Sequence, residues 1–369
     1  MAKSVCIADV CKEIFAGGDV PKSALSYEKT AEYNVPIFSN GEKNCGLYGY
    51  TNNARVKEPS ITVSARGTIG YTAIRTEPFV PVVRLITLTP KSEVIDLDYL
   101  FYATQNYKFE GSGTSIPQLT VPMLKKYKFP LPEMSHQKAI AVKFEKLDQL
   151  ISLRKQQLAK LDDLVKARFV EMFGDPIRNE KGWNTYTLAE MCDGIGDGLH
   201  GTPEYDENGE YPFINGNNLI SGIIQINPST KKVNKKTYEK HYIKISQNAI
   251  LLSINGTLGR IAFYNSEQVM LGKSACYCNL RDEVNRIFVY NIMKTDAFAR
   301  YLEDNATKST IKNVGLKAIR EYRLIMPPIP LQNQFSSFVE RVDQQKQTVQ
   351  QSLEKLELMK KALMQEYFG

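Results

Sequence analysis

Two stretches of the chain place apolar residues at alternating steps of four and three, a spacing that collects side chains on one stripe of an α-helix. In the first stretch these residues are Ile140, Phe144, Leu147, Ile151, Leu158, Leu161, Val165 and Met172, with Arg154 and Arg168 at the interrupted steps. A heptad pattern of this length predicts a continuous helix of about 40 residues, roughly 60 Å long at 1.5 Å per residue. Gly174, followed by Asp175-Pro176, is a typical signal for a helix end.

The second stretch repeats the first. Its apolar residues are Phe335, Val339, Val342, Val349, Leu353, Leu356, Leu363 and Tyr367, with Lys346 and Lys360 at the interrupted steps. Residues 115–174 and 310–369 align without a gap. Identical pairs in this alignment include Ile116/Ile311, Tyr127/Tyr322, Pro132/Pro327, Gln137/Gln332, Asp148/Asp343 and Phe173/Phe368. The chain is therefore internally duplicated, with two similar long helices.

The segments before the helices have a different pattern. They are rich in Gly, Pro, Tyr and β-branched residues, with short strand-like runs at 60–64 and 82–88 and one helical stretch near 97–107. Two motifs recur: Arg66-Gly67-Thr68-Ile69-Gly70 corresponds to Asn255-Gly256-Thr257-Leu258-Gly259, and Pro36–Gly41 corresponds to Pro212–Gly216. We therefore predict an α+β fold of two similar mixed α/β domains, each followed by a long helix. The expected boundaries are 1–132, 133–175, 176–328 and 329–369.

A long helix with an apolar stripe must cover that stripe in water, and the other helix offers a complementary one. Parallel pairing would bring both β-rich domains to one end, whereas antiparallel pairing creates a pseudo-twofold axis between them. We favour an antiparallel coiled coil over the alternative that each helix packs only on its own domain. The residues expected to pair the helices are Phe144, Leu147, Ile151, Leu158, Leu161, Val165, Val342, Val349, Leu353, Leu356 and Leu363.

Composition narrows the functional classes. The chain has 369 residues, 43% of them hydrophobic, with no apolar run long enough for a membrane span and no apolar signal stretch in residues 1–6. Six scattered cysteines are typical of reduced thiols, so we predict a cytoplasmic protein. The three histidines are too far apart in sequence to suggest a metal site, and no Walker-type loop or amino-methyltransferase motif occurs. The sequence thus predicts no catalytic residue, metal or cofactor.

The distribution of charge is more informative than the net value of +7, which merely permits a polyanionic partner. Six lysines fall in one short polar stretch: Lys231, Lys232, Lys235, Lys236, Lys240 and Lys244. They suit contacts with DNA phosphates, although a solvated protein face would have the same composition. Gly196–Gly201 formally matches GxGxxG, but Thr202-Pro203 follows where a dinucleotide site needs a helix. We interpret it as a flexible glycine loop near phosphates, with His200 either joining it or being an ordinary loop histidine.

The layout resembles the specificity (S) subunit of Type I restriction–modification enzymes. The resemblance rests on the proline-rich segments 129–132 and 326–330, which lead to Gln137 and Gln332, the heptad helices and the Phe-Gly endings. The Gly-Thr-x-Gly segments and Asp197–Pro203 also look like that family, and the match covers the whole chain twice in the same order. It implies two target-recognition domains that each read one half of a split DNA sequence. It further implies that the helices fix the spacer and dock two methyltransferase (M) subunits, that restriction (R) subunits join the complex, and that the chain itself is non-catalytic.

The expected DNA contacts are polar or basic residues of the loops, any of which could instead be plain turns or solvated loops. They are Lys22, Asn40, Arg66, Thr68, Ser112, Thr114, His200, Thr202, Asn215, Asn217, Lys231, Lys232, Lys235, Lys236, Asn255, Thr257, Lys308 and Ser309. Two other hypotheses stay open. One is a stand-alone, two-headed nucleic-acid-binding adaptor without methyltransferase partners, and the other is a nuclease or methyltransferase that carries its own site.

Overall fold

The computed structural model describes residues 3–106 and 118–369, which form two compact units. Unit 1 comprises residues 1–157 and 349–369, and unit 2 comprises residues 158–348. Two 40-residue helices, α4 (Met134–Phe173) and α9 (Ile329–Phe368), each contribute one half to each unit. Gly174 ends α4 with φ of 78°, a left-handed conformation that glycine adopts without strain.

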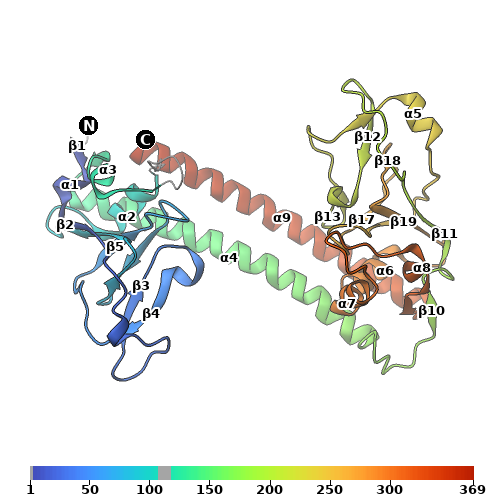
Figure 1. Cartoon of the computed structure of the whole chain (residues 1–369), viewed down its shortest axis with the longest axis horizontal. Coiled ribbons are helices and arrows are strands. Elements are labelled where there is room, and N and C mark those ends of the chain that lie inside the picture. Colours follow the sequence, from blue (N-terminus) through green and yellow to red (C-terminus); the bar gives the residue numbers. More distant parts are fainter. Residues whose placement is uncertain (1–2, 107–117) are drawn as a thin grey trace. The chain divides into compact units, whose positions relative to one another are not determined.

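The described part of unit 1 that precedes α4 contains three small sheets and three short α-helices. Figure 1 labels several of these elements. Its largest sheet has the order β2-β8-β5-β6, a second has the order β4-β3-β7, and β1 pairs with β9. Before α4, the elements in chain order are β1 (Lys3–Cys6), α1 (Ile7–Val10), β2 (Cys11–Ala16), η1 (Lys22–Ala24), β3 (Val35–Phe38), η2 (Lys43–Gly46), β4 (Leu47–Thr51), β5 (Ser60–Val63), β6 (Thr72–Arg75), β7 (Val80–Pro81), β8 (Ile86–Pro90), α2 (Leu97–Asn106), α3 (Val121–Lys125) and β9 (Lys128–Leu131).

Unit 2 repeats this topology. The sheet β11-β19-β16-β17 corresponds to the largest sheet of unit 1, β15-β12-β18 contains the counterpart of β3 paired with β7, and β10 pairs with β20 as β1 pairs with β9. Before α9, its elements are β10 (Thr185–Thr187), β11 (Cys192–Asp197), β12 (Tyr211–Ile214), η3 (Gly216–Asn218), β13 (Leu219–Ile220), β14 (Ile223–Ile224), β15 (Lys232–Val233), α5 (Lys235–Lys240), β16 (Ala249–Ser253), β17 (Ile261–Phe263), β18 (Met270–Leu271), β19 (Ala275–Leu280), α6 (Arg286–Met293), α7 (Asp296–Asp304), α8 (Leu316–Glu321) and β20 (Arg323–Ile325).

A buried glutamine fixes the start of each long helix. In unit 1 the amide of Gln137 donates to the carbonyl oxygens of Val94 and Pro132, at 3.2 and 2.9 Å, and accepts from the backbone N–H of Asp96 at 2.9 Å. In unit 2 Gln332 donates to the carbonyl of Pro327 at 2.7 Å and accepts from the N–H of Asn285 at 3.2 Å. The duplicated glutamines therefore join each helix to its own β-rich domain through two matching bonds, one to the carbonyl of the duplicated proline and one from a backbone N–H.

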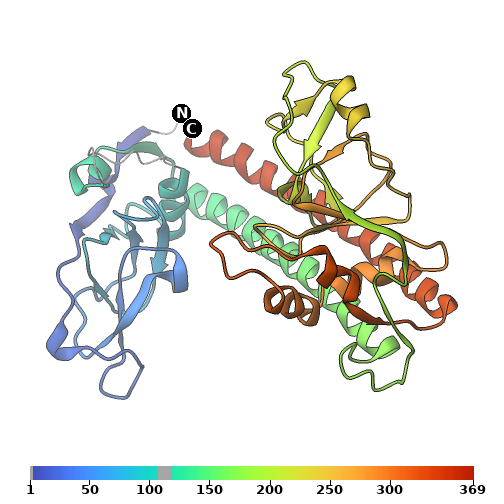
Figure 2. The same ribbon diagram turned by 45° about the vertical axis from the view of Figure 1, so that its right-hand side comes forward.

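Within unit 1 the first half of α4 packs against the last half of α9 (Figures 1 and 2). Phe144 stacks on Phe368, with ring centroids 5.9 Å apart. Further along α4, Arg154 donates to Ser352 at 3.2 Å. The partner's residue number falls as that of α4 rises, so this pairing is antiparallel.

Unit 2 shows the same direction in the other halves of the two helices. Lys346 of α9 forms an ion pair with Asp162 of α4 at 2.7 Å, and Phe335 meets Phe169 edge-on at 5.5 Å. The predicted fold class, with mixed α/β domains and antiparallel paired helices, is thus confirmed.

The residues expected to pair the helices differ in depth. Phe144, Leu147, Ile151, Val342, Val349 and Leu353 are buried, while Leu158, Leu161, Val165, Leu356 and Leu363 are half-buried. The lysines at heptad positions find partners on the facing helix, as Lys360 does with Asp148 at 2.6 Å, whereas Arg168 pairs with Glu171 of its own helix. Lysine and arginine are therefore tolerated in the contact between α4 and α9, which we call the helix seam, because their charged groups reach its edge.

The predicted strand at 82–88 is wrong in part. The backbone turns between β7 and β8, and Val83 and Arg84 have φ of 52° and 64°. L-residues rarely adopt these angles, so two in succession break the strand and form a corner. The helix expected near 97–107 is present as α2, a ten-residue helix.

Several other features bear on function. No described helix is long and apolar enough to cross a membrane. All six cysteines are free thiols. Residues 3–106 and 118–369 contain no group of three or more His, Cys, Asp and Glu side chains that could hold a metal ion.

Candidate nucleic-acid interface

Two arginines from separate loops of unit 1 meet at one glutamine. Arg66 follows β5, and its Nε and Nη2 atoms donate to Oε1 of Gln118 at 3.0 and 2.8 Å. Arg84, at the corner before β8, donates to the same oxygen through Nη1 at 3.4 Å. Among the described residues, neither arginine forms an ion pair with a carboxylate. The cluster therefore carries positive charge available to an external partner.

Asn40 holds the two arginine loops together from behind. Its Oδ1 accepts from the N–H of Ala65 at 2.7 Å, and its Nδ2 donates to the carbonyl of Val83 at 2.6 Å. Ala65 and Val83 are the residues directly before the two arginines. Both ends of the Asn40 amide are thus used within the protein, and the side chain positions the arginines.

The corner that carries Arg84 is held by backbone bonds to a glycine pair. The N–H groups of Val83 and Arg84 donate to the carbonyls of Gly18 and Gly17, at 2.8 and 3.0 Å. A Cβ on Gly17 would lie 2.5 Å from the carbonyl atoms of Pro81, so only glycine allows this approach. Each non-glycine residue in a left-handed conformation costs about 1–2 kcal/mol, and such strain persists where surrounding contacts fix it.

The corresponding loops of unit 2 carry neutral groups. Asn255 stands where unit 1 has Arg66, and its Nδ2 donates to Oδ1 of Asn313 at 3.4 Å. The equivalence is fixed by the backbone, because the N–H of Val314 bonds the carbonyl of Ile254 as the N–H of Leu119 bonds that of Ala65, both at 2.9 Å. The same position therefore presents a guanidinium in unit 1 and a carboxamide in unit 2.

A hydroxyl network replaces the second arginine in unit 2. Ser274 occupies the place of Arg84, donating its hydroxyl to Oδ1 of Asn215 at 2.9 Å and accepting from the N–H of Gly216 at 2.9 Å. Asn215 is thereby tied to the loop of Ser274, whereas Lys273 and Asn217, the neighbours of this pair, are exposed. The exposed lysine gives this loop a positive charge without an arginine pair.

The lysine-rich segment of unit 2 forms an exposed basic surface around stacked tyrosines. Lys231, Lys232, Lys235 and Lys236 are all exposed, at β15 and the start of α5. In the same region the rings of Tyr211 and Tyr238 stack with centroids 4.0 Å apart, and Lys231 Nζ lies 5.7 Å from the ring centroid of Tyr205. The only carboxylate paired with this segment in the described structure is Glu239, 3.8 Å from Lys235. The segment therefore keeps most of its positive charge.

The remaining predicted contact residues are scattered. Lys22, Thr68, Thr202, Thr257, Lys308 and Ser309 are exposed. His200 is also exposed, but its Nε2 lies 2.7 Å from a carboxylate oxygen of Asp197. Ser112 and Thr114 lie outside the described residues.

Sequence reasoning missed Gln118, Arg84, Ser274 and Asn313. A signal for two of them was present, because Gln118 and Asn313 occupy matching positions in the aligned repeats 115–174 and 310–369. Amides at the same place in two copies can make the same contact in both. Arg84 and Ser274 had no such signal, since their neighbours depend on the fold.

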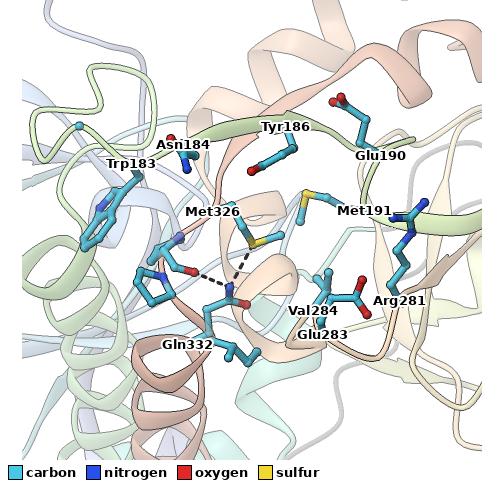
Figure 3. A pocket seen from close by; sticks show the side chains of 14 residues that line it. Trp183, Asn184, Tyr186, Glu190, Met191, Arg281, Glu283, Val284, Met326 and Gln332 are labelled. Atoms are coloured by element: carbon cyan, nitrogen blue, oxygen red, sulfur yellow. Dashed lines mark hydrogen bonds between the residues drawn. The ribbon is translucent and has the colours of Figure 1, made fainter.

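A pocket of about 570 Å³ lies in unit 2 beside the start of α9 (Figure 3). Trp183, Tyr186, Met191 and Arg281 line it, and Gln332 lies at its base. Its carboxylate Glu190 accepts hydrogen bonds from the backbone N–H and hydroxyl of Thr187, which hold the pKa of Glu190 below its usual value. This acid stays ionised near neutral pH and is engaged in the loop, an arrangement that suits binding better than proton transfer.

Comparison with known proteins gives a consistent result. Residues 2–163 and 180–358 match the family model described as the Type I restriction modification DNA specificity domain. A putative type I specificity subunit from Mycoplasma pneumoniae, S.MpnORF507P, is 36% identical over 163 residues, which are 41% of this chain and 44% of that protein. A second, S.MpnORF89P, is 37% identical over 163 residues, 41% of this chain and 48% of its own. The chain thus matches just under half the length of these relatives.

Longer matches come from more distant proteins. The specificity subunit of the Type I restriction enzyme MjaIX from Methanocaldococcus jannaschii is 24% identical over 372 residues, 88% of this chain and 80% of that protein. The crystal structure of a Type-I restriction-modification system S subunit from M. genitalium superposes with a TM-score of 0.61 at 18% identity, covering 100% of this chain and 96% of the other. At this identity the structural match shows a shared fold.

Proposed function

The chain belongs to the Type I restriction–modification DNA specificity family, and on that premise we propose that it selects the DNA sequence on which such a complex acts. Residues 1–132 and 176–328 are the two target-recognition domains, and each reads one half of a split sequence. The helices of 133–175 and 329–369 hold the halves at a fixed spacing. We expect this DNA recognition to take place in the cytoplasm, where host DNA is found.

One observation gives the strongest support for assigning a different half-sequence to each domain. The two units share a strand order, yet the corresponding loops carry Arg66 with Gln118 in one and Asn255 with Asn313 in the other. Arginine and asparagine are suited to different base edges. A shared framework with unlike polar groups fits two domains that read different half-sequences.

We further propose that the paired helices dock two methyltransferase subunits, through which restriction subunits join. On α4 the apolar residues Val142, Leu150 and Leu153 are 45%, 43% and 58% exposed. Their spacing of eight and three residues places them on one face of the helix. Exposed apolar groups on one face favour contact with another protein. Methyl transfer and cleavage belong to these partners, so this chain contributes no catalytic residue or cofactor.

Co-expression with its methyltransferase subunit tests the proposal. Sequencing of host DNA for modified adenines is expected to show one asymmetric split motif that appears only when both chains are present. Purification of the chain alone, without a methyltransferase and with no modified motif, favours a stand-alone adaptor. Modification by the isolated chain with S-adenosylmethionine indicates an enzyme with its own site.

A further inference from the structure

We propose that Arg66 reads the edge of a guanine base in the half-sequence contacted by unit 1, with Gln118 and Asn40 as positioning residues. The inference deepens the proposed function and rests on it. Within the DNA-contacting loop of unit 1, the single side chain of Arg66 specifies one base pair.

The hydrogen bonds of Arg66 leave its recognition edge free. A guanidinium has five N–H donors in one plane, and Gln118 takes one from Nε and one from Nη2. The two N–H groups of Nη1 and the second of Nη2 are not used in these bonds. This end-on pair of nitrogens is the fork that fits the O6 and N7 acceptors of guanine in the major groove. Gln118 therefore sets the plane of the fork, and no other described residue forms a hydrogen bond with its tip.

The loops around Arg66 are held in a way that a loosely placed phosphate contact does not need. Asn40 fixes the backbone directly before Arg66, and the N–H of Leu119 fixes the segment of Gln118 against Ala65. A phosphate can be neutralised by a flexible point charge, whereas reading a base requires a fixed orientation. The rigid support thus favours base recognition.

Asn255, the residue of unit 2 that corresponds to Arg66, also favours base recognition over phosphate binding. A phosphate contact is the same for any DNA sequence, so it gives no reason for the two units to carry different side chains at this position. Unit 2 has Asn255 instead, supported by Asn313 as Arg66 is supported by Gln118. Asparagine is the side chain that pairs with adenine N6 and N7. A change from guanidinium to carboxamide on the same support is typical of a change in the base that is read.

Charge adds discrimination against other bases. Arg84 brings a second guanidinium to Gln118, and no described carboxylate pairs with either arginine. The guanine edge offers two acceptors, while adenine offers a donor at N6. Two donor groups facing that N6 donor would leave it without an acceptor, so adenine is rejected at this position.

The test uses the complex with methyltransferase subunits and sequences its modified motif. Arg66→Ala is expected to relax one G·C pair in one half of the motif, with about tenfold or more loss of discrimination there, while every other position is kept. Arg66→Lys should relax the same pair because lysine lacks the fork. Gln118→Ala should partly relax recognition of this pair. Gln118→Glu should keep it, since a carboxylate also orients a guanidinium.

Matched controls separate readout from folding. Arg178→Ala removes one exposed arginine from the turn that follows α4, where it pairs with Glu180, and should leave the motif unchanged. Asn255→Ala should alter only the other half. Thermal melting shows which variants fold, and Arg66→Lys and Gln118→Ala decide the question if Arg66→Ala does not.

Three results would overturn the inference. They are an unchanged motif, relaxation at an A·T pair, and equal weakening on all sequences with a smaller salt dependence, which is the signature of a phosphate contact. A wild-type complex that modifies no DNA instead rejects the proposed function itself.

Discussion

Unit 1 and unit 2 have the same strand order but differ in how they present charge. Unit 1 brings Arg66 and Arg84, the latter at a strained corner, to a single glutamine oxygen. Unit 2 has amides and a hydroxyl at that place and concentrates its charge in an exposed lysine segment beyond it. The framework and helix contacts are conserved between the copies, whereas the polar loop groups are not. The duplicated parts therefore stabilise the fold, and the divergent parts are where we expect the two units to contact different DNA sequences.

The largest expected effect comes from the helix seam. Phe144 is fully buried and stacks on Tyr102 and Phe368, so Phe144→Ala should cost about 3–5 kcal/mol. Its counterpart in unit 2 is the smaller Val339, where the change to alanine should cost about 2 kcal/mol. Denaturant unfolding followed by hydrogen exchange measures both losses and assigns them to a unit. Equal losses would show that the seam is not anchored more strongly in unit 1.

The helix-anchoring glutamines should behave alike. Gln137→Ala and Gln332→Ala each leave buried backbone groups without partners, at a cost of about 2–4 kcal/mol. The exposed Gln149 on the same helix as Gln137 is the control, and its change to alanine should stay within about 0.5 kcal/mol. Chemical denaturation compares the three variants. A loss confined to one of the two buried positions would contradict an equivalent role.

The lysine segment should act without regard to sequence. Replacing Lys232 and Lys235 by alanine removes two phosphate contacts, so the slope of log affinity against log salt should fall by about 2. Titration of the methyltransferase complex with target and unrelated DNA measures this. Weakening on the target alone would assign these lysines to base readout, and would erase the contrast with Arg66.

The smallest expected effect is a gain in stability. Val83 is 43% exposed and has φ of 52°, so Val83→Gly relieves a strained backbone while losing little packing. Relief of the backbone strain stabilises the folded state, and the higher entropy of the unfolded chain with glycine offsets part of this effect. The net gain should therefore reach about 1 kcal/mol. The exposed helical Val142 serves as a control, where glycine should destabilise. A loss at Val83 measured by thermal unfolding would mean that the corner is not strained.

The sequence predicted the parts of the fold that depend on local pattern. The heptads and Gly174 indicated both long helices, and the matched glutamines marked where each helix meets its domain. Pairing of the helices followed from the need to cover two apolar stripes, and the antiparallel direction was favoured because it creates a pseudo-twofold axis between similar domains. These features could be found because the apolar spacing that defines them is regular and local.

The site was less accessible to sequence reasoning. Residues 82–88 look like a strand, and the corner at Val83 and Arg84 exists because Gly17, Gly18 and Asn40 hold it from elsewhere in the chain. Arg66 was predicted as a DNA contact, but its partner Gln118 lies 52 residues away. Contacts between distant loops depend on tertiary packing, which periodicity does not encode.

The most direct test of the central claim is the spacing of the modified motif after one heptad is removed from both helices. Deleting residues 151–157 and the facing residues 351–357 shortens the seam by roughly 10 Å at 1.5 Å per residue. The account predicts that both half-sequences are retained and that the spacer between them becomes about three base pairs shorter. An unchanged spacer with both halves retained would contradict the role of the helices in setting it.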